Sequence, residues 1–307
     1  MDEVELELIL TNYGFDHMEG LTFLGEGYYR KNYLLNTGGG TYVLKIMDEN
    51  TKNPVFAFKV LEKLYSKGQK VAKPIKNYNG ELVTYMGDAV AAVQHHVPGS
   101  PIENPARSDL KLLGEKFGEL HNTLEEIDVG GKGHLDSMAE FKMLSEEYVP
   151  NNSYITGKVS EMRKKIDSLP LGSFTEGIIH GDCGLEDFFF KNGKLTGILD
   201  FGNSRNDFFL YDLATTITYL SIENEEKNLE TFLNSYKKVF NISEEEISYL
   251  GFFITQRILD QVLFHNYRYE EDLSKGIEEV EDNLKILRHY TRRLKGMEEK
   301  INSLPRL

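Results

Sequence analysis

Cysteine is almost absent from this chain, and its one cysteine is Cys183. A single cysteine excludes an intramolecular disulfide. The sequence also lacks any run that approaches the ~20 apolar residues that span a bilayer. The first residues, MDEVELELIL, carry acids where a secretory signal carries a basic end. These features predict a cytoplasmic protein without membrane partners.

Positive charge is scarce as well. The 307 residues contain 35 Lys and Arg against 49 Asp and Glu, for a formal net charge of −14 and a pI of about 5.1. Nucleic acids and anionic membranes are recognised by clustered Lys and Arg, so this composition argues against both. It is compatible with a cationic substrate, although acidic surfaces also serve solubility alone. The length allows one large or two medium domains with substantial cores.

The most informative segment is IHGDCGLEDFFFKNGKLTGILDFG, which begins at Ile179. Two short apolar runs, 188–190 and 198–199, predict strands. Asn192-Gly193 between them predicts a tight hairpin turn, because Asn and Gly accept positive φ at both central positions. The segment therefore predicts a strand pair that turns back on itself.

This hairpin is expected to bring Asp187 and Asp200 to the same end, with Asp182 on the loop that leads in. Hard cations such as Mg²⁺ bind carboxylate oxygens in this kind of cluster, and phosphate oxygens complete the shell. The third carboxylate can then contact a hydroxyl that must lose a proton. The segment thus indicates metal-assisted chemistry on a hydroxyl.

The residues before this segment divide at Pro98-Gly99, which breaks both strand and helix. The first part is predicted to contain helices over 1–14 and 53–67 and strands over 22–24, 31–36, 41–46, 71–75, 82–86 and 89–97. The second part is mainly helical, with helices predicted over 108–124, 141–148, 153–168, 211–222, 226–240, 244–267 and 272–304. Ser243 is the expected cap of the helix over 244–267. The prediction is an α+β chain of two lobes, 1–97 and 98–307.

The motif resembles the phosphotransferase site of the aminoglycoside phosphotransferase and choline kinase superfamily. These are small-molecule kinases built like eukaryotic protein kinases. The family motif is His-Gly-Asp, four residues, Asn, and then Asp-Phe-Gly or a close variant. This chain has HGDCGLED and later DFG, so Asp187 stands where the family usually has Asn. The resemblance covers nearly the full length, with its specific signal in residues 179–214.

The resemblance implies a two-lobed protein-kinase-like fold with Asp182 as the catalytic base. It further implies that Asp200 is the main magnesium ligand and that Asp187 takes the second metal position. His180 would hold the loop by hydrogen bonds and transfer no proton. A Cys-His hydrolase is disfavoured, because no group that could orient His180 against Cys183 is identifiable.

The nucleotide would be held by the first lobe. Lys45 ends the run Tyr-Val-Leu-Lys, where kinase-like folds place a lysine that grips the phosphates. Such folds normally pair this lysine with a glutamate on a helix, and the sequence does not identify that glutamate. Glu62 is the one acid inside the helix over 53–67, and it can equally pair with nearby lysines. Gly25 and Gly27 follow the first strand and can form a nucleotide-positioning loop or an ordinary hairpin turn.

Two further sets of residues are candidates. Gln94 and His96 lie in the expected hinge, where they would meet the adenine edge. Asn206 and Asp207 lie after the metal loop and are candidates for the substrate pocket. Asp212 starts a predicted helix, either as its N-cap or as a brace for the catalytic loop.

Within the superfamily, features such as Asn32-Tyr33, Asn206-Asp207 and Tyr211-Asp212 look most like the homoserine-kinase-like branch. The chain is therefore expected to transfer the γ-phosphoryl of ATP or GTP, with Mg²⁺, to a hydroxyl of a small amine-bearing acceptor such as homoserine, an amino alcohol or an aminoglycoside. An aminoglycoside O-phosphotransferase proper and a non-catalytic kinase-fold binding protein are the alternatives. The replacement of Asn by Asp187 is the one feature that supports the last.

Overall fold

The computed structural model describes residues 3–28, 30–48, 53–102, 104–220 and 226–271, together with Leu273 and Arg292. By its contacts the chain divides into two compact units. Unit 1 consists of Met1–Pro105, Asn122–His134 and His180–Arg205, and unit 2 consists of Ala106–His121, Leu135–Ile179 and Asn206–Leu307. The predicted division into lobes at residue 97 stays a prediction, and the contacts place Asp182, Asp187 and Asp200 in unit 1.

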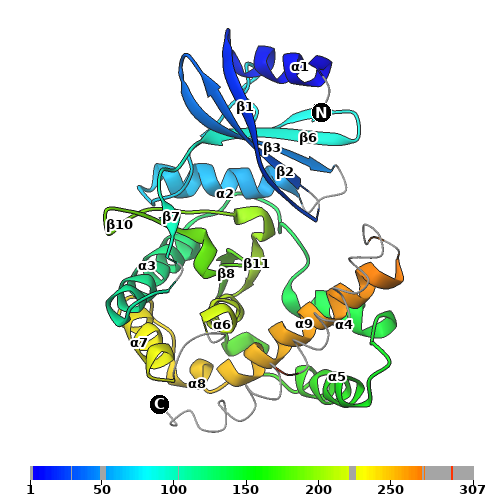
Figure 1. Cartoon of the computed structure of the whole chain (residues 1–307). Helices are drawn as coiled ribbons and strands as arrows, with labels where there is room; N and C mark the ends of the chain where they lie inside the picture. The colour runs from blue at the N-terminus through cyan, green and yellow to red at the C-terminus, as the bar shows by residue number, and fades with distance from the viewer. Residues whose placement is uncertain are drawn as a thin grey trace. The chain divides into compact units, whose positions relative to one another are not determined.

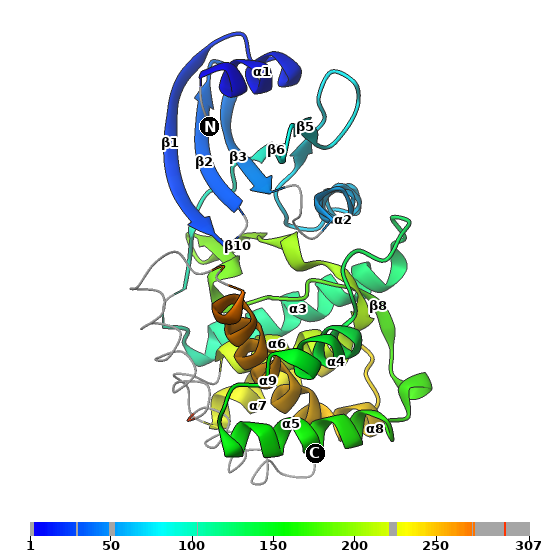
Figure 2. The same cartoon turned by 90° about the vertical axis from the view of Figure 1, so that its right-hand side faces the viewer.

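A six-stranded antiparallel sheet forms most of unit 1 (Figure 1). Its strand order is β1 (Met18–Gly27), β2 (Arg30–Thr37), β3 (Gly40–Asp48), β6 (Ala89–His95) and β4 (Pro74–Ile75), and β5 (Thr84–Met86) also pairs with β6. Helix α1 (Glu3–Tyr13) lies at one end of the sheet and α2 (Pro54–Ser66) toward the other, as Figures 1 and 2 show. The sheet and α1 bury a common core of Ile9, Tyr13, Leu35, Tyr42, Leu44, Ala91 and Val93.

Local sequence signals set both ends of α2. The Asn53 side chain accepts a hydrogen bond from the backbone N–H of Phe56 at 3.1 Å, and Pro54 occupies the first turn, where its missing N–H costs nothing. Past the other end, Gly68 has a φ of +85°, a conformation that glycine adopts without strain. The helix predicted over 53–67 is therefore confirmed.

The predicted hairpin is also present in unit 1. Strands β9 (Phe188–Lys191) and β10 (Lys194–Ile198) pair in antiparallel register around Asn192 and Gly193. These two turn residues have φ values of 53° and 72°, as a type I′ turn requires. The short strand β7 (Ser100–Pro101) extends this sheet along the other edge of β9.

Unit 2 is mainly helical. Its elements include most of α3 (Arg107–Glu126), α4 (Ser137–Glu147), α5 (Ser153–Ile166), α6 (Phe209–Leu220), α7 (Glu226–Lys237), α8 (Glu244–Ile247), α9 (Leu250–Glu270) and the strand pair β8 (Glu176–Ile179) and β11 (Arg205–Phe208). Helix α9, orange in Figure 1, contacts α4, α5 and α6. The α+β class is confirmed, with most strands before residue 102 and most helices after residue 106.

Some predicted elements differ from the structure. The single helix expected over 244–267 is two helices, α8 and α9, separated at residues 248–249. The carboxylate of Glu246 completes the capping box of α8 with Ser243 and also accepts the backbone N–H of Thr175 at 2.7 Å. The expected cap at Ser243 is confirmed. The strand over 71–75 shortens to β4, and Val71 forms only an isolated bridge with Ile198. The helix predicted over 272–304 lies outside the described residues.

Among the described residues, no helix combines the length and the apolar character that crossing a membrane needs.

A close approach of α3 and α7 in unit 2 yields a stability prediction. A Cβ at Gly114 would lie 2.3 Å from the carbonyl oxygen of Phe232, so backbone would have to move. Gly114→Ala should lower the free energy of unfolding by about 1–3 kcal/mol. Gly157 on α5 is the matched control, because a Cβ there meets nothing within 4 Å. Gly157→Ala should raise stability by about 0.5–1 kcal/mol. Urea unfolding of both variants checks the pair, and equal effects would contradict this packing.

Candidate active site

The loop that carries Asp182 is fixed by hydrogen bonds within unit 1. His180 Nε2 donates to the carbonyl oxygen of Leu199 at 2.7 Å, which leaves Nδ1 to accept the backbone N–H of Asp182 at 3.4 Å. Asn203 Nδ2 donates to Asp182 Oδ2 at 3.2 Å. His180 therefore joins the Asp182 loop to the residues just before Asp200, and Asn203 orients the Asp182 carboxylate.

Gly181 is required beside Asp182 for two reasons. Its φ is +85°, and a Cβ there would lie 2.3 Å from the carbonyl oxygen of Asn203. A larger residue would meet both backbone strain and a steric clash. The Gly of the His-Gly-Asp motif thus allows the loop to approach the turn at Phe201–Asn203.

Asp187 is buried at the end of a short 3₁₀ turn, Leu185–Asp187, directly before β9. Its Oδ2 accepts the backbone N–H of Gly184 at 2.8 Å. Its backbone carbonyl accepts the N–H of Leu199 at 2.9 Å. This hydrogen bond joins the residue before β9 to the residue after β10, as expected for the predicted hairpin.

Asp200 follows β10 in the left-handed conformation, with φ 68° and ψ 51°. Only a few per cent of non-glycine residues have positive φ, and such residues gather at functional sites. Both carboxylate oxygens of Asp200 accept from Arg30, Nη1 donating to Oδ1 and Nη2 to Oδ2. Arg30 begins β2 and carries no motif signal, so the sequence did not single it out.

The charges of the site act on one another. Burial, together with the charge of Asp200, holds the pKa of Asp187 well above its usual range. Burial also raises the pKa of Asp200, but the positive charges of Lys45 and Arg30 outweigh it and leave that pKa lowered. Burial lowers the pKa of Lys45, with Asp200 opposing that shift. The charge of Asp200 is thus offset by cations, while burial and the neighbouring Asp200 disfavour the charged form of Asp187.

This carboxylate pair fits a hard divalent cation. Asp187 and Asp200 repel each other in a buried setting, and a cation between them would relieve the repulsion. A second group also has metal-ligand atom types: atoms of His180, Cys183 and Asp187 lie within 4.8 Å of one another. Both ring nitrogens of His180 already form hydrogen bonds. We therefore favour the carboxylate pair over this mixed group.

Lys45 lies on β3, opposite Asn32 of β2 and Ala92 of β6. Its electrostatic partners are Asp200 and Asp187, both in unit 1. Glu62 instead forms an ion pair with Lys76 at 2.7 Å, between Oε1 and Nζ. Within the described residues, no ion pair between Glu62 and Lys45 is present.

The glycines and the hinge residues are placed by the sheet. Gly25 and Gly27 are part of β1, whose register shifts between Phe23 and Gly25, and Gly27 pairs with Arg30. Gln94 is buried in β6. The backbone N–H of His96 donates to the carbonyl oxygen of Thr41 at 3.1 Å. Nucleotide contacts by these residues stay predictions.

Asn206 and Asp207 belong to unit 2. Asp207 is buried, and its oxygens accept from Ser137 N at 2.7 Å, Ser137 Oγ at 3.0 Å and Phe208 N at 2.8 Å. These contacts hold the start of α4. They argue against the substrate contact predicted for Asp207, whereas Asn206 is half-buried on β11.

Asp212 also has a structural position in unit 2. It lies inside the first turn of α6, which begins at Phe209, so the N-cap expected there is wrong. Its Oδ2 lies 3.2 Å from His121 Nε2, and His121 Nδ1 lies 2.8 Å from the hydroxyl of Tyr236. Side chains from α3, α6 and α7 thus form a buried polar chain. Nothing in the sequence around His121 predicted it.

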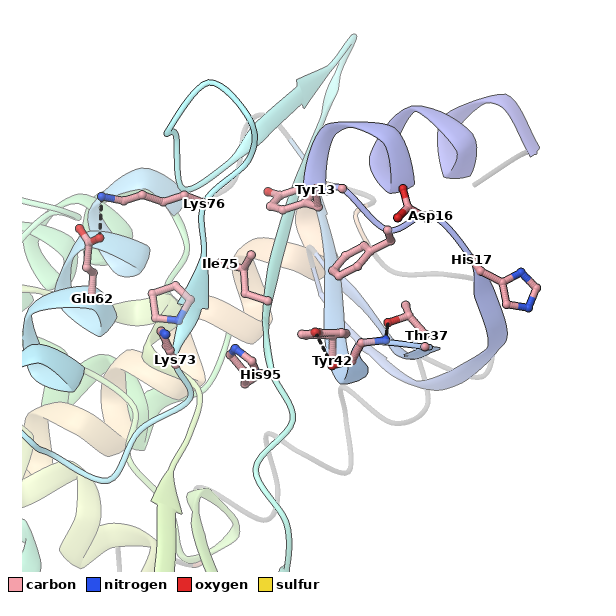
Figure 3. Close-up of a pocket in the computed structure, with 15 residues that line it drawn as sticks. Tyr13, Asp16, His17, Thr37, Tyr42, Glu62, Lys73, Ile75, Lys76 and His95 are labelled. Carbon is pink, nitrogen blue, oxygen red and sulfur yellow. Dashed lines mark hydrogen bonds and ion pairs between the residues drawn. The ribbon is translucent and has the colours of Figure 1, made fainter.

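The structure also has a cavity of about 680 Å³ on the sheet of unit 1 (Figure 3). Tyr42, Lys73, Ile75 and His95 line its middle, and Glu62 and Lys76 form their ion pair on one side. None of the candidate catalytic or metal-binding carboxylates lines this cavity. It is therefore separate from the site around Asp200.

Comparison with known proteins identifies the class to which this fold and site belong. The chain resembles an amicoumacin kinase solved with AMP-PNP, Ca²⁺ and Ami, with a TM-score of 0.78, 18% identity and coverage of 98% of this chain and 94% of that one. A microcompartment-associated aminopropanol kinase gives a TM-score of 0.77, 16% identity and 98% coverage of both chains. The fold is therefore that of the protein-kinase-like phosphotransferases.

Comparison of sequences identifies the same class of protein. The model of the phosphotransferase enzyme family matches residues 20–247, and the chain belongs to that family. A homoserine kinase of Parvibaculum lavamentivorans is 24% identical over 252 residues, which cover 79% of this chain and 78% of the relative. The predicted resemblance is confirmed, and the chain is a small-molecule kinase that phosphorylates an alcohol group.

The contacts of Asp207 generate a prediction. Asp207→Asn should lower the free energy of unfolding by about 1.5–3 kcal/mol, because charged hydrogen bonds to buried Ser137 are lost. The KM for the acceptor should not change. Asp136→Asn is the matched control: Asp136 caps the same helix from the surface, and Asn caps about as well as Asp. Chemical unfolding and acceptor kinetics test both, and a raised KM at unchanged stability would return Asp207 to the substrate pocket.

Proposed function

We propose that this chain transfers the γ-phosphoryl group of ATP or GTP to a hydroxyl of a small, amine-bearing molecule. The observation that supports this most is the grouping of Asp182, Asp187 and Asp200 in one unit with Lys45 and Arg30. Three carboxylates and two cations in this arrangement suit a reaction between a polyphosphate and an alcohol.

In this proposal Asp182 acts on the acceptor. Its carboxylate, oriented by Asn203, accepts a hydrogen bond from the acceptor hydroxyl and takes its proton. The hydroxyl oxygen forms the new bond to the γ-phosphorus as the bond to the β,γ-bridging oxygen breaks, and the nucleoside diphosphate leaves. Positioning and charge neutralisation supply most of the rate in such transfers.

The remaining residues bind the nucleotide and the metal. Lys45 contacts the phosphates, the backbone at Gly25 and Gly27 positions them, and the segment of Gln94 and His96 meets the base. Asp187 and Asp200 would hold Mg²⁺, which when bound neutralises phosphate charge. The raised pKa of Asp187 is consistent with a carboxylate that gains from a nearby cation.

The acceptor is argued from charge and from the relatives. The net charge of −14 favours a cationic acceptor over an anionic one. Relatives with homoserine kinase and aminopropanol kinase in their names support a small amino alcohol or homoserine. The amicoumacin kinase supports the alternative of an antibiotic phosphotransferase. Asn206, which is half-buried on β11, stays the candidate substrate residue.

The direct test is a turnover screen with ATP and GTP over homoserine, amino alcohols, aminoglycosides and neutral sugars. An amine-bearing alcohol should be preferred. Asp182→Asn should then lose about 10²–10⁴-fold in turnover with that acceptor while it still binds nucleotide.

A variant that keeps more than about a tenth of the activity would remove Asp182 from the role of base, since general-base assistance is larger than that. Exclusive activity on an anionic or uncharged acceptor would contradict the substrate class. Nucleotide binding without turnover on any compound would instead favour a non-catalytic binding protein.

Asp187 carries a second prediction, because it stands where relatives of this kind usually have Asn. If Asp187 ligates the metal, its charge repels the triphosphate when metal is scarce. The wild type should therefore need more free Mg²⁺ for half-maximal turnover than Asp187→Asn, or should prefer Mn²⁺. Turnover is measured against free metal for both proteins, with Glu186→Gln as a control for the loss of an exposed neighbouring charge. Superimposable curves for wild type and Asp187→Asn would show that Asp187 does not ligate the metal.

A further inference from the structure

The Arg30 side chain is placed to act on the proposed metal site. It lies at the first position of β2 and pairs across the hairpin end with Gly27. Its two terminal nitrogens bind the two oxygens of Asp200 in a parallel fork. Arg30 and Asp200 each keep 29% of their side-chain surface exposed, so the pair is partly shielded from water. Such bidentate, charge-assisted pairs are among the stronger hydrogen-bonded contacts in proteins.

The glycines around Arg30 leave room for this fork. A Cβ at Gly202, in the Asp-Phe-Gly motif, would lie 3.0 Å from Arg30 Nη1. A Cβ at Gly27 would lie 3.4 Å from Arg30 Nε. A side chain at Gly202 would crowd the guanidinium, whereas a Cβ at Gly27 would lie at ordinary van der Waals distance. The turn Phe201–Asn203, which carries Gly202, therefore leaves room for the fork.

The fork conflicts with metal binding by the same carboxylate. Arg30 is positively charged at every accessible pH, so it cannot release Asp200 by losing a proton. It occupies both oxygens of Asp200, and its charge repels a second cation. Lys45 already lies in the field of Asp200, so the fork adds a second positive charge there. A metal that binds the face of the Asp200 carboxylate now held by the fork must therefore displace Arg30.

We propose that Arg30 is a positioning residue that exchanges partners, holding Asp200 while the site is empty and moving to a nucleotide phosphate when the metal–nucleotide complex binds. This inference rests on the proposed function, because it takes Asp200 as the metal ligand. A guanidinium fork matches phosphate oxygens as well as carboxylate oxygens, so the nucleotide supplies the replacement anion. Metal and nucleotide then bind cooperatively, since each favours the state in which Arg30 has left Asp200.

The experiment measures binding of Mn²⁺ by electron paramagnetic resonance, with and without AMP-PNP. In nucleotide-free protein, Arg30→Gln should bind Mn²⁺ about 10- to 100-fold more tightly than wild type, the equivalent of one charged hydrogen-bonded pair. Lys31→Gln is the matched control, because it removes the same charge from the exposed neighbour on β2 and should bind like wild type. With AMP-PNP the advantage of Arg30→Gln should disappear, because the wild-type arginine then has a phosphate to bind.

Two more variants keep the result decisive. Arg30→Lys retains the charge without the fork and should bind Mn²⁺ with intermediate affinity, which covers the case in which Arg30→Gln folds poorly. Asp200→Ala should lose Mn²⁺ binding. The exchange is overturned if nucleotide-free wild type, Arg30→Gln and Arg30→Lys bind Mn²⁺ with equal affinity while Asp200→Ala loses binding. That result would still support Asp200 as the metal ligand. Unchanged binding in Asp200→Ala overturns both.

Discussion

The balance of charge around Asp200 is the constraint on which the rest of the site depends. Two acidic side chains, buried Asp187 and partly shielded Asp200, lie near each other, where like charges repel more strongly than in water. Lys45 and Arg30 offset the charge of Asp200 but leave the pKa of Asp187 well above its usual range. The site thus holds one carboxyl group whose charge is offset by cations and one whose charged form is disfavoured by burial. In the proposed function, a divalent cation would favour the charged form of Asp187 and would compete with Arg30 for Asp200.

The scaffold maintains this balance through backbone contacts rather than through the acids themselves. Leu199 is the central residue, because its carbonyl accepts from His180 and its N–H donates to the carbonyl of Asp187. Gly181 and the left-handed backbone of Asp200 permit the close turns that these bonds need. The motif is therefore best understood as a set of backbone constraints that place carboxylates. Its histidine and glycine carry as much of the geometry as its acids.

Acidic residues close together in sequence have different fates in this chain. Asp200 faces two cations, whereas Asp207, seven residues later, is buried at the start of α4 with Ser137 as its donor. Asp212 lies in a polar chain with His121 and Tyr236. These three aspartates differ in the donor group that contacts their carboxylate oxygens. Asp200 contacts a cationic side chain, whereas Asp207 accepts from donors that hold the start of α4, so the second carboxylate contributes to fold stability.

The sequence by itself determined the local geometry and the family. Asn192-Gly193 predicted the hairpin, and the spacing of Asp182, Asp187 and Asp200 predicted their cluster, because turn and strand preferences act over a few residues. Only the tertiary structure decided which side chains contact these carboxylates. Arg30 lies 170 residues from Asp200 in the chain, and no local pattern encodes such a pair. Arg30 begins β2 of the six-stranded sheet and Asp200 follows β10 of a separate sheet, so their contact depends on how the two sheets approach each other in the folded chain.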